Sequence, residues 1–173
     1  PLSSLEPRVR GLSGRAPGDP EARADWVRLA LDTFVEGCVG ETIAALVARR
    51  SQRRCEDPAT MKVLESIVED EGRHAALAWQ TIEWIFEASG THREAVLEAL
   101  EQQAEAMAAK ARVASERDAL PAADPDVGVL ARYGRVDRRT ELLAQRDAWT
   151  DLILPTLLAL SQSTAEQGPS AHT

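Results

Sequence analysis

The sequence has few aromatic residues, few cysteines and no long apolar run. Phenylalanine, tryptophan and tyrosine together make up 4% of the 173 residues, which is too little for a typical β-sandwich or β-barrel. The two cysteines, Cys38 and Cys55, do not provide the framework of a disulfide-stabilised fold. No apolar stretch approaches the length of a transmembrane helix, so we expect no membrane span.

Basic charge is also scarce. Lys and Arg number 20 against 28 Asp and Glu, which gives a formal net charge of -8 and disfavours a nucleic-acid-binding protein. Hydrophobic residues make up 44% and charged residues 28%, as in globular proteins. The many Ala, Leu, Glu and Arg residues favour helices. We therefore predict an all-α protein located in the cytoplasm, unless an upstream signal was removed from this chain.

Proline, glycine and aspartate mark the expected start of the helical part. Residues 1–19 contain several prolines and glycines with little apolar periodicity, which predicts a flexible N-terminal arm. The pair Asp19-Pro20 predicts a helix over 20–52, because Asp caps a helix and Pro suits its first position. The pair Asp57-Pro58 repeats this signal and predicts a second helix over 58–89.

Two further helices follow from similar signals. Thr91 and Glu94 have the spacing of a capping box, and they predict a third helix over 92–118. Asp137 is placed to cap a fourth helix over 138–164.

These helices predict an antiparallel four-helix bundle over residues 20–166, followed by a flexible tail over 167–173. The last connection, 119–136, is the longest and is expected to be irregular. Pro155 lies inside the apolar pattern of the last helix, so we expect a kink or a local break there.

The most informative segment for chemistry lies in the second helix. Glu71 and His74 are three residues apart, so both project from one face. Leu64 and Ile67 precede them, which predicts that this is the core-facing side. A core that admits a carboxylate and an imidazole must neutralise or pair them. A metal ion would do both, and a salt bridge with a hydrogen bond is the alternative.

The first helix offers two partners for this pair. In an antiparallel hairpin, Glu36 lies about 2 Å and Glu41 about 5 Å from the level of the pair along the helix axis. Glu36 is therefore favoured by height and Glu41 by helix face, and both remain candidates. Gly37 and Gly40 lie between them, although each costs about 1 kcal/mol in a helix relative to Ala. This cost predicts a close helix approach or a local opening at the site.

The last two helices contain further candidates. The same comparison of positions along the helix axes places Glu105 and Asp147 close to the level of His74. There they would complete a second half-site without a histidine. Solvated acidic side chains are the alternative for both. Cys38 and Met107 also lie near this height and would form a soft site that favours copper, against the ordinary packing of two core residues.

The segments Glu36-Gly-Cys-Val-Gly-Glu41 and Asp70-Glu71-Gly-Arg-His74-Ala resemble the ferritin-like diiron-carboxylate superfamily, and bacterial ferritin-like domain proteins in particular. In that superfamily, one Glu from each of two helices and a Glu-x-x-His from each of the other two bind two irons. The resemblance covers residues 26–86. The later helices match in length and order only, and the last helix has no Glu-x-x-His.

The resemblance implies iron as cofactor, with one or two ions per chain held by Glu36 or Glu41, Glu71 and His74; manganese, zinc and copper are the other candidates. A ferrous pair would react with dioxygen, either in iron oxidation or in oxidation of an unknown small-molecule substrate. A site with one metal, or one shared across a dimer, is a variant, and we expect a homodimer or higher homo-oligomer. The alternative is a bundle that has lost the second half of the site and serves as an oligomerisation or protein-interaction module.

Overall fold

The structure is a computed structural model, and it describes residues 18–116, 120–122 and 126–166. Within these ranges the chain is helical apart from short links and contains no strand, so the all-α prediction is confirmed. The predicted flexible arm over 1–19, except for its last two residues, and the predicted tail over 167–173 lie outside the described residues.

The first long helical run consists of three consecutive segments. The α-helix α2 (Pro20–Asp32) passes into the π-helix η2 (Thr33–Glu41), which continues as the α-helix α3 (Thr42–Arg54). The run starts as predicted, because the Asp19 carboxylate accepts a hydrogen bond from the Glu21 backbone N–H at 2.9 Å. The π-helical segment was not predicted, and segments of this kind often occur at functional sites.

The second run is α4 (Pro58–Ala88). Its predicted cap is confirmed, since the Asp57 carboxylate accepts a hydrogen bond from the Thr60 backbone N–H at 2.7 Å. Gly90 ends the helix with a φ of 54°, a left-handed conformation that glycine adopts without strain.

The third run consists of the short 3₁₀ turn η3 (Gly90–His92) and α5 (Arg93–Ala114). The predicted capping box with Thr91 is wrong, because the 3₁₀ turn leads directly into α5 and the helix has no side-chain cap. The predicted end near residue 118 is also too late. The Ser115 hydroxyl donates a hydrogen bond to the Arg112 carbonyl at 2.9 Å just after α5, and this bond competes with continuation of the helix.

The connection that was expected to be irregular contains the short helix α6 (Val127–Ala131). The described residues therefore form four long helical runs and a fifth, short one. The backbone N–H groups of Glu56 and Asp57 both donate to the Arg132 carbonyl, at 2.8 and 3.2 Å. These bonds attach the residues after α6 to the link before α4.

The last run consists of α7 (Arg138–Ala148), the π-helix η4 (Trp149–Ile153) and α8 (Leu154–Glu166). Its predicted cap, Asp137, is confirmed by a hydrogen bond from the Thr140 backbone N–H at 2.8 Å. The π-helical turn ends two residues before Pro155. Proline lacks an N–H group and crowds the carbonyl four residues earlier, so a wider turn at this position allows the run to continue.

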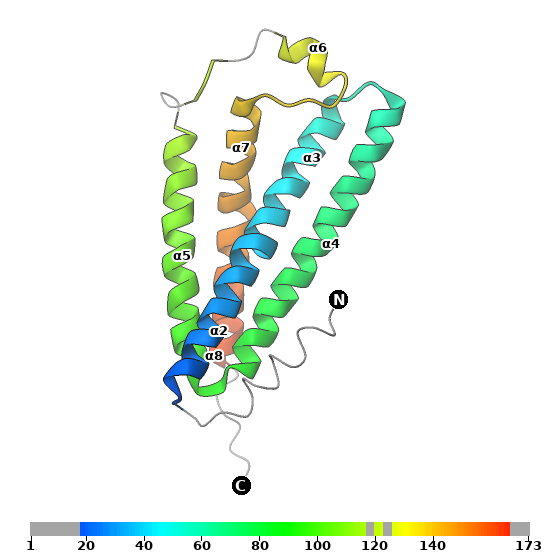
Figure 1. The fold of residues 1–173 in the computed structure, drawn as a ribbon. Coiled ribbons are helices and arrows are strands. Elements are labelled where there is room, and N and C mark those ends of the chain that lie inside the picture. Colours follow the sequence, from blue (N-terminus) through cyan, green and yellow to red (C-terminus); the bar gives the residue numbers. More distant parts are fainter. Residues whose placement is uncertain (1–17, 117–119, 123–125, 167–173) are drawn as a thin grey trace.

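Figure 1 shows the four long runs side by side, with successive runs pointing in opposite directions. The first run packs along α4 through η2 and α3, while α2 packs on α5 and α3 packs on α7. The largest fully buried side chains of this core are Trp26, Phe34, Phe86, Ile82, Ile85, Leu100, Ile153, Val96 and Cys38. Among the described helices, none combines the length and the apolar character needed to cross a bilayer.

Phe34 forms the central aromatic contact of this core. Its ring is 0% exposed and meets Trp79 of α4 and Trp149 of η4 edge-on, with centroid distances of 6.0 and 6.3 Å. Edge-to-face contacts of this kind add about 0.5–1.5 kcal/mol beyond the burial of apolar area. The two π-helical segments therefore contact each other through one well-packed aromatic pair.

Gly37 explains how closely the first run approaches α4. A Cβ atom placed on Gly37 would lie 2.5 Å from the Cβ of Ala78, far inside the normal contact distance of about 3.5–4.0 Å. At Gly40 the nearest atom would be the Val35 carbonyl oxygen at 3.5 Å, which is an ordinary contact. The predicted close approach is thus confirmed, and Gly37 is the glycine that permits it.

Candidate metal centre

Glu41, Glu71 and His74 converge where η2 lies against the middle of α4. Each offers one donor atom, and the three atoms lie within 4.8 Å of one another. The close contact between Gly37 and Ala78 positions the two backbones for this convergence. The group therefore joins a carboxylate from the first run to a carboxylate and an imidazole from the second.

Of the two alternatives on the first run, Glu41 is the one that reaches α4. Glu36 is exposed and is not part of the group that Glu41 forms with Glu71 and His74. The difference in height favoured Glu36, but a side chain must also point toward the neighbouring helix. Helix face was therefore the better guide than a difference of a few ångströms along the axis.

The two carboxylates are electrostatically coupled. The pKa of Glu41 is raised, first by a hydrogen bond shared with Glu71, then by partial burial and by repulsion from the Glu71 charge, while His74 lowers it. Nδ1 of His74 lies 3.6 Å from Oε2 of Glu71. The pair thus favours a positive charge at this point, which a proton or a cation supplies.

His74 lies at the rim of the group. Its side chain is 61% exposed, so the prediction that it lies on the core-facing side of α4 is wrong. Ile67 is also exposed, whereas Ala78 on the core side is buried. Three residues turn a helix by about 300°, so His74 is rotated by about 60° from Glu71, away from the core.

An apolar stripe on α4 continues on both sides of His74. It consists of the exposed residues Val63, Ile67, Leu77 and Trp84, and we call it the α4 stripe. With His74 these residues occupy five of the seven positions that a heptad repeat, typical of helix pairing, would place on one face between residues 63 and 84. The other two positions are the polar Asp70 and Thr81. The stripe was not predicted, because Asp70 and Thr81 interrupt the repeat in the sequence and the exposure of its members is seen only in the structure.

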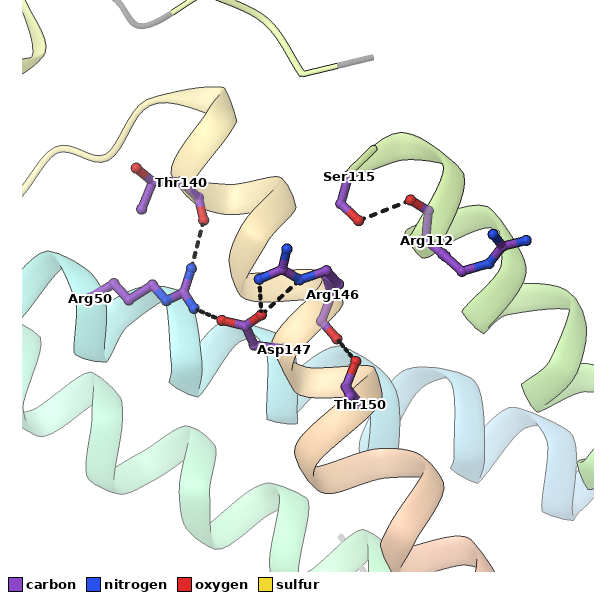
Figure 2. A network of polar contacts seen from close by, with 7 residues as sticks. All are labelled: Arg50, Arg112, Ser115, Thr140, Arg146, Asp147 and Thr150. Carbon is purple, nitrogen blue, oxygen red and sulfur yellow. Dashed lines mark hydrogen bonds and ion pairs between the residues drawn. The ribbon is translucent and has the colours of Figure 1, made fainter. Parts of the chain in front are cut away.

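Asp147 is not brought to the group, because two arginines hold it elsewhere (Figure 2). Nε and Nη2 of Arg146 donate to its Oδ1 at 3.0 and 2.8 Å, and Arg50 donates to Oδ2. Partial burial alone would raise the pKa of Asp147, but the bonds from Arg146 and Arg50 outweigh it and lower that pKa. Arg50 follows Glu41 by nine residues, which is about half a turn in net rotation. Asp147 therefore lies on the other side of α3.

The remaining candidates also lie apart from the group. Glu105 is exposed and lines a groove between α5 and α8. Cys38 is buried in the apolar core, and burial raises the pKa of its thiol to about 12. Met107 packs against the same core. A neutral, buried thiol fits ordinary packing, because copper binding requires a thiolate.

No family model, curated protein or solved structure matches the chain. The chemistry of the site therefore follows from its own geometry. Two carboxylates and an imidazole are donors that suit non-haem iron. Metal–ligand bonds of roughly 2.0–2.2 Å keep the donor atoms of one ion within about 4.4 Å of one another, so small side-chain rotations would close this group around an ion. With three donors from the described part of the chain, coordination positions stay open.

Proposed function

We propose that the chain is a metal-binding protein of ferritin-like type, in which Glu41, Glu71 and His74 bind iron. The observation that carries this proposal is the convergence of two carboxylates and an imidazole from two helices. The alternating direction of the four long runs (Figure 1) supports a four-helix bundle, with α6 as an addition in the last connection. A cytoplasmic location belongs to the same proposal.

Each residue has a distinct role in this site. Glu41 and Glu71 neutralise the charge of the ion, and their mutual repulsion is relieved when a cation lies between them. His74 contributes a neutral nitrogen donor from the exposed side. Iron held here would supply electrons to dioxygen, either to oxidise iron itself or to oxidise a small molecule.

A second copy of the chain is the best candidate to complete the site. His74 lies close to the middle of the α4 stripe, which extends from Val63 to Trp84. If two α4 helices pack antiparallel along this stripe, the two His74 side chains meet near the two-fold axis. Both three-donor groups then face one interface, and the dimer holds two ions, one for each chain.

Metal binding by matched variants tests this proposal. Apo protein is dialysed anaerobically against Fe(II), and the bound iron is measured by elemental analysis. We expect about one iron per chain for the wild type, and loss of binding for Glu41→Gln and His74→Ala. Glu36→Gln is the control, because it removes a carboxylate five residues from Glu41 that lies outside the group. Equal iron content in Glu41→Gln and Glu36→Gln would reject the site.

A metal-free interaction module is the second candidate function, and the exposure of both His74 and the α4 stripe favours it. In that case the protein forms the same dimer without binding iron. Replacement of Leu77 by Glu distinguishes the two cases. If the dimer completes the metal site, the wild type binds iron and this variant loses both dimerisation and iron. If the protein is a metal-free interaction module, the wild type binds no iron and the variant loses dimerisation alone.

A further inference from the structure

A groove of about 830 Å³ lies between α5 and the last helical run, apart from the Glu41 group. Its α5 wall has small residues at its centre, among them Ala104 and Ala108, beside the charged Glu101, Glu105 and Arg112. Leu157 and Leu158 lie on its opposite wall. Buried Trp149 also lines it. Because alanine side chains end at Cβ, they leave open the space that longer side chains would fill.

The size and lining of this groove are typical of a small-molecule site. Ligand pockets of about 300–1,000 Å³ are mostly apolar and contain a few polar groups that orient the ligand. Leu154 and Leu158 are exposed along the groove, the latter by 57%. Covering such apolar surface is favourable by roughly 25 cal/mol per Å², so an apolar ligand gains affinity where it covers these leucines.

One end of the groove carries a positive charge, that of Arg146, and Figure 2 shows the contacts that hold this side chain. Arg146 lines the groove, and Asp147 holds its guanidinium through Nε and Nη2. Arg50 donates to the same carboxylate, so two guanidiniums share one negative charge and the cluster has a net positive charge. Nη1 of Arg146 takes no part in these bonds and can donate to a ligand.

The opposite end has different chemistry. Glu101 and Ser161 line it, and the acidic Glu105 lies between the two ends on the α5 side. From Glu101 to Arg112 the α5 wall is about 16 Å long at the helical rise. An anionic group would be repelled by Glu101 and Glu105 and attracted to Arg146, so an elongated ligand has one favoured orientation.

We propose that this groove binds an amphipathic carboxylate of the medium-chain fatty-acid class. Its apolar chain lies along Ala108 and Leu157, and its carboxylate accepts a hydrogen bond from Arg146. Binding here does not depend on the metal, because the groove uses α5 and the last helical run rather than η2 and α4.

Titration of the full chain with sodium decanoate below its micelle concentration tests the proposal by calorimetry. We expect one decanoate per chain. Arg146→Gln should weaken binding about tenfold or more, because a charge-assisted hydrogen bond is lost. Decyltrimethylammonium has the same chain with a positive head group, and it should bind at least tenfold more weakly than decanoate.

A pair of alanine variants tests the apolar wall. Ala108→Leu fills the groove and should abolish decanoate binding. Ala106→Leu makes the same change at an exposed position rotated by about 200° from Ala108, and should bind like the wild type. If Ala108→Leu does not fold by circular dichroism, Arg146→Gln and the cationic probe still decide the matter, since neither alters the apolar wall.

Four results would overturn the proposal. These are no binding of decanoate, equal binding of the anionic and cationic probes, undiminished binding by Arg146→Gln, and undiminished binding by a folded Ala108→Leu variant. A further result would identify a different occupant. If decanoate does not bind and Leu158→Glu lowers the oligomeric mass, the groove is a contact between copies of the chain.

Discussion

Replacing Gly37 with alanine tests the closest contact between η2 and α4. The new Cβ would lie 2.5 Å from the Cβ of Ala78, at least about 1 Å inside the normal carbon–carbon distance. Both atoms are fixed to the backbone, so rotation of a side chain cannot relieve the overlap and the helices must separate. Overpacking of a core typically costs about 1–3 kcal/mol, and the rigidity of this contact favours the upper part of that range.

Alanine also stabilises the helix relative to glycine, and this gain must be subtracted from the cost of overpacking. It favours a helix over glycine by about 1 kcal/mol, so the net loss expected for Gly37→Ala is about 1–2 kcal/mol. Gly72→Ala is the matched control, because it lies in the interior of α4 and its added Cβ would meet nothing within 4 Å. That variant should gain about 1 kcal/mol.

Urea denaturation of the two variants measures this difference. Their free energies of unfolding should differ by about 2–3 kcal/mol, which is the cost of overpacking at Gly37, because the gain in helix preference is the same in both variants and cancels. Gly37→Ala should also weaken iron binding, because separated helices move Glu41 away from Glu71. If both variants are stabilised equally, the close approach of η2 to α4 is refuted.

Three further predictions concern the core, the ion cluster and the α4 stripe. Phe34→Ala should cost about 3–5 kcal/mol of unfolding free energy, because it empties a fully buried aromatic site; a loss below about 1 kcal/mol would contradict the packing. The lowered pKa of Asp147 in the folded state means that its ionised form stabilises the fold near neutral pH and that this contribution is lost as the pH falls below about 4. Asp147→Asn should therefore cost about 1 kcal/mol at pH 7 and less at pH 3 in thermal melts, and a pH-independent difference would refute the ion cluster. Leu77→Glu should shift the protein to a smaller species in sedimentation while leaving its helical circular dichroism intact, whereas an unchanged mass would remove the α4 stripe from the interface.

The ends of the helices could be predicted because capping is a local interaction. Asp19, Asp57 and Asp137 each accept a hydrogen bond from a backbone N–H two or three residues later, so a few adjacent residues contain the whole signal. Thr91 shows the limit of such motifs. The 3₁₀ turn that begins at Gly90 replaces the expected cap there, and the sequence motif alone does not distinguish a capping box from a 3₁₀ turn at the start of a helix.

The candidate site required information that is not local. Glu41 and Glu71 come together because Gly37 lets two helices approach. The two glycines in the first helix predicted either that approach or a local opening, without deciding between Glu36 and Glu41. The outward rotation of His74 follows from where the core face of α4 lies, which depends on all of its neighbours. Asp147 was chosen because its level along the helix axis, counted across the longest connection, matches that of His74. A level along the axis does not specify the side of the helix from which a residue projects.

Native mass spectrometry of anaerobically iron-loaded protein tests the central claim most directly, because it counts chains and metal ions in the same particle. The proposed site predicts a dimer, or a multiple of it, with one iron for each chain, and iron-free particles for the Glu41→Gln variant. A wild-type protein that carries no iron after loading, in whatever oligomeric state, would contradict the claim that Glu41, Glu71 and His74 form a metal site.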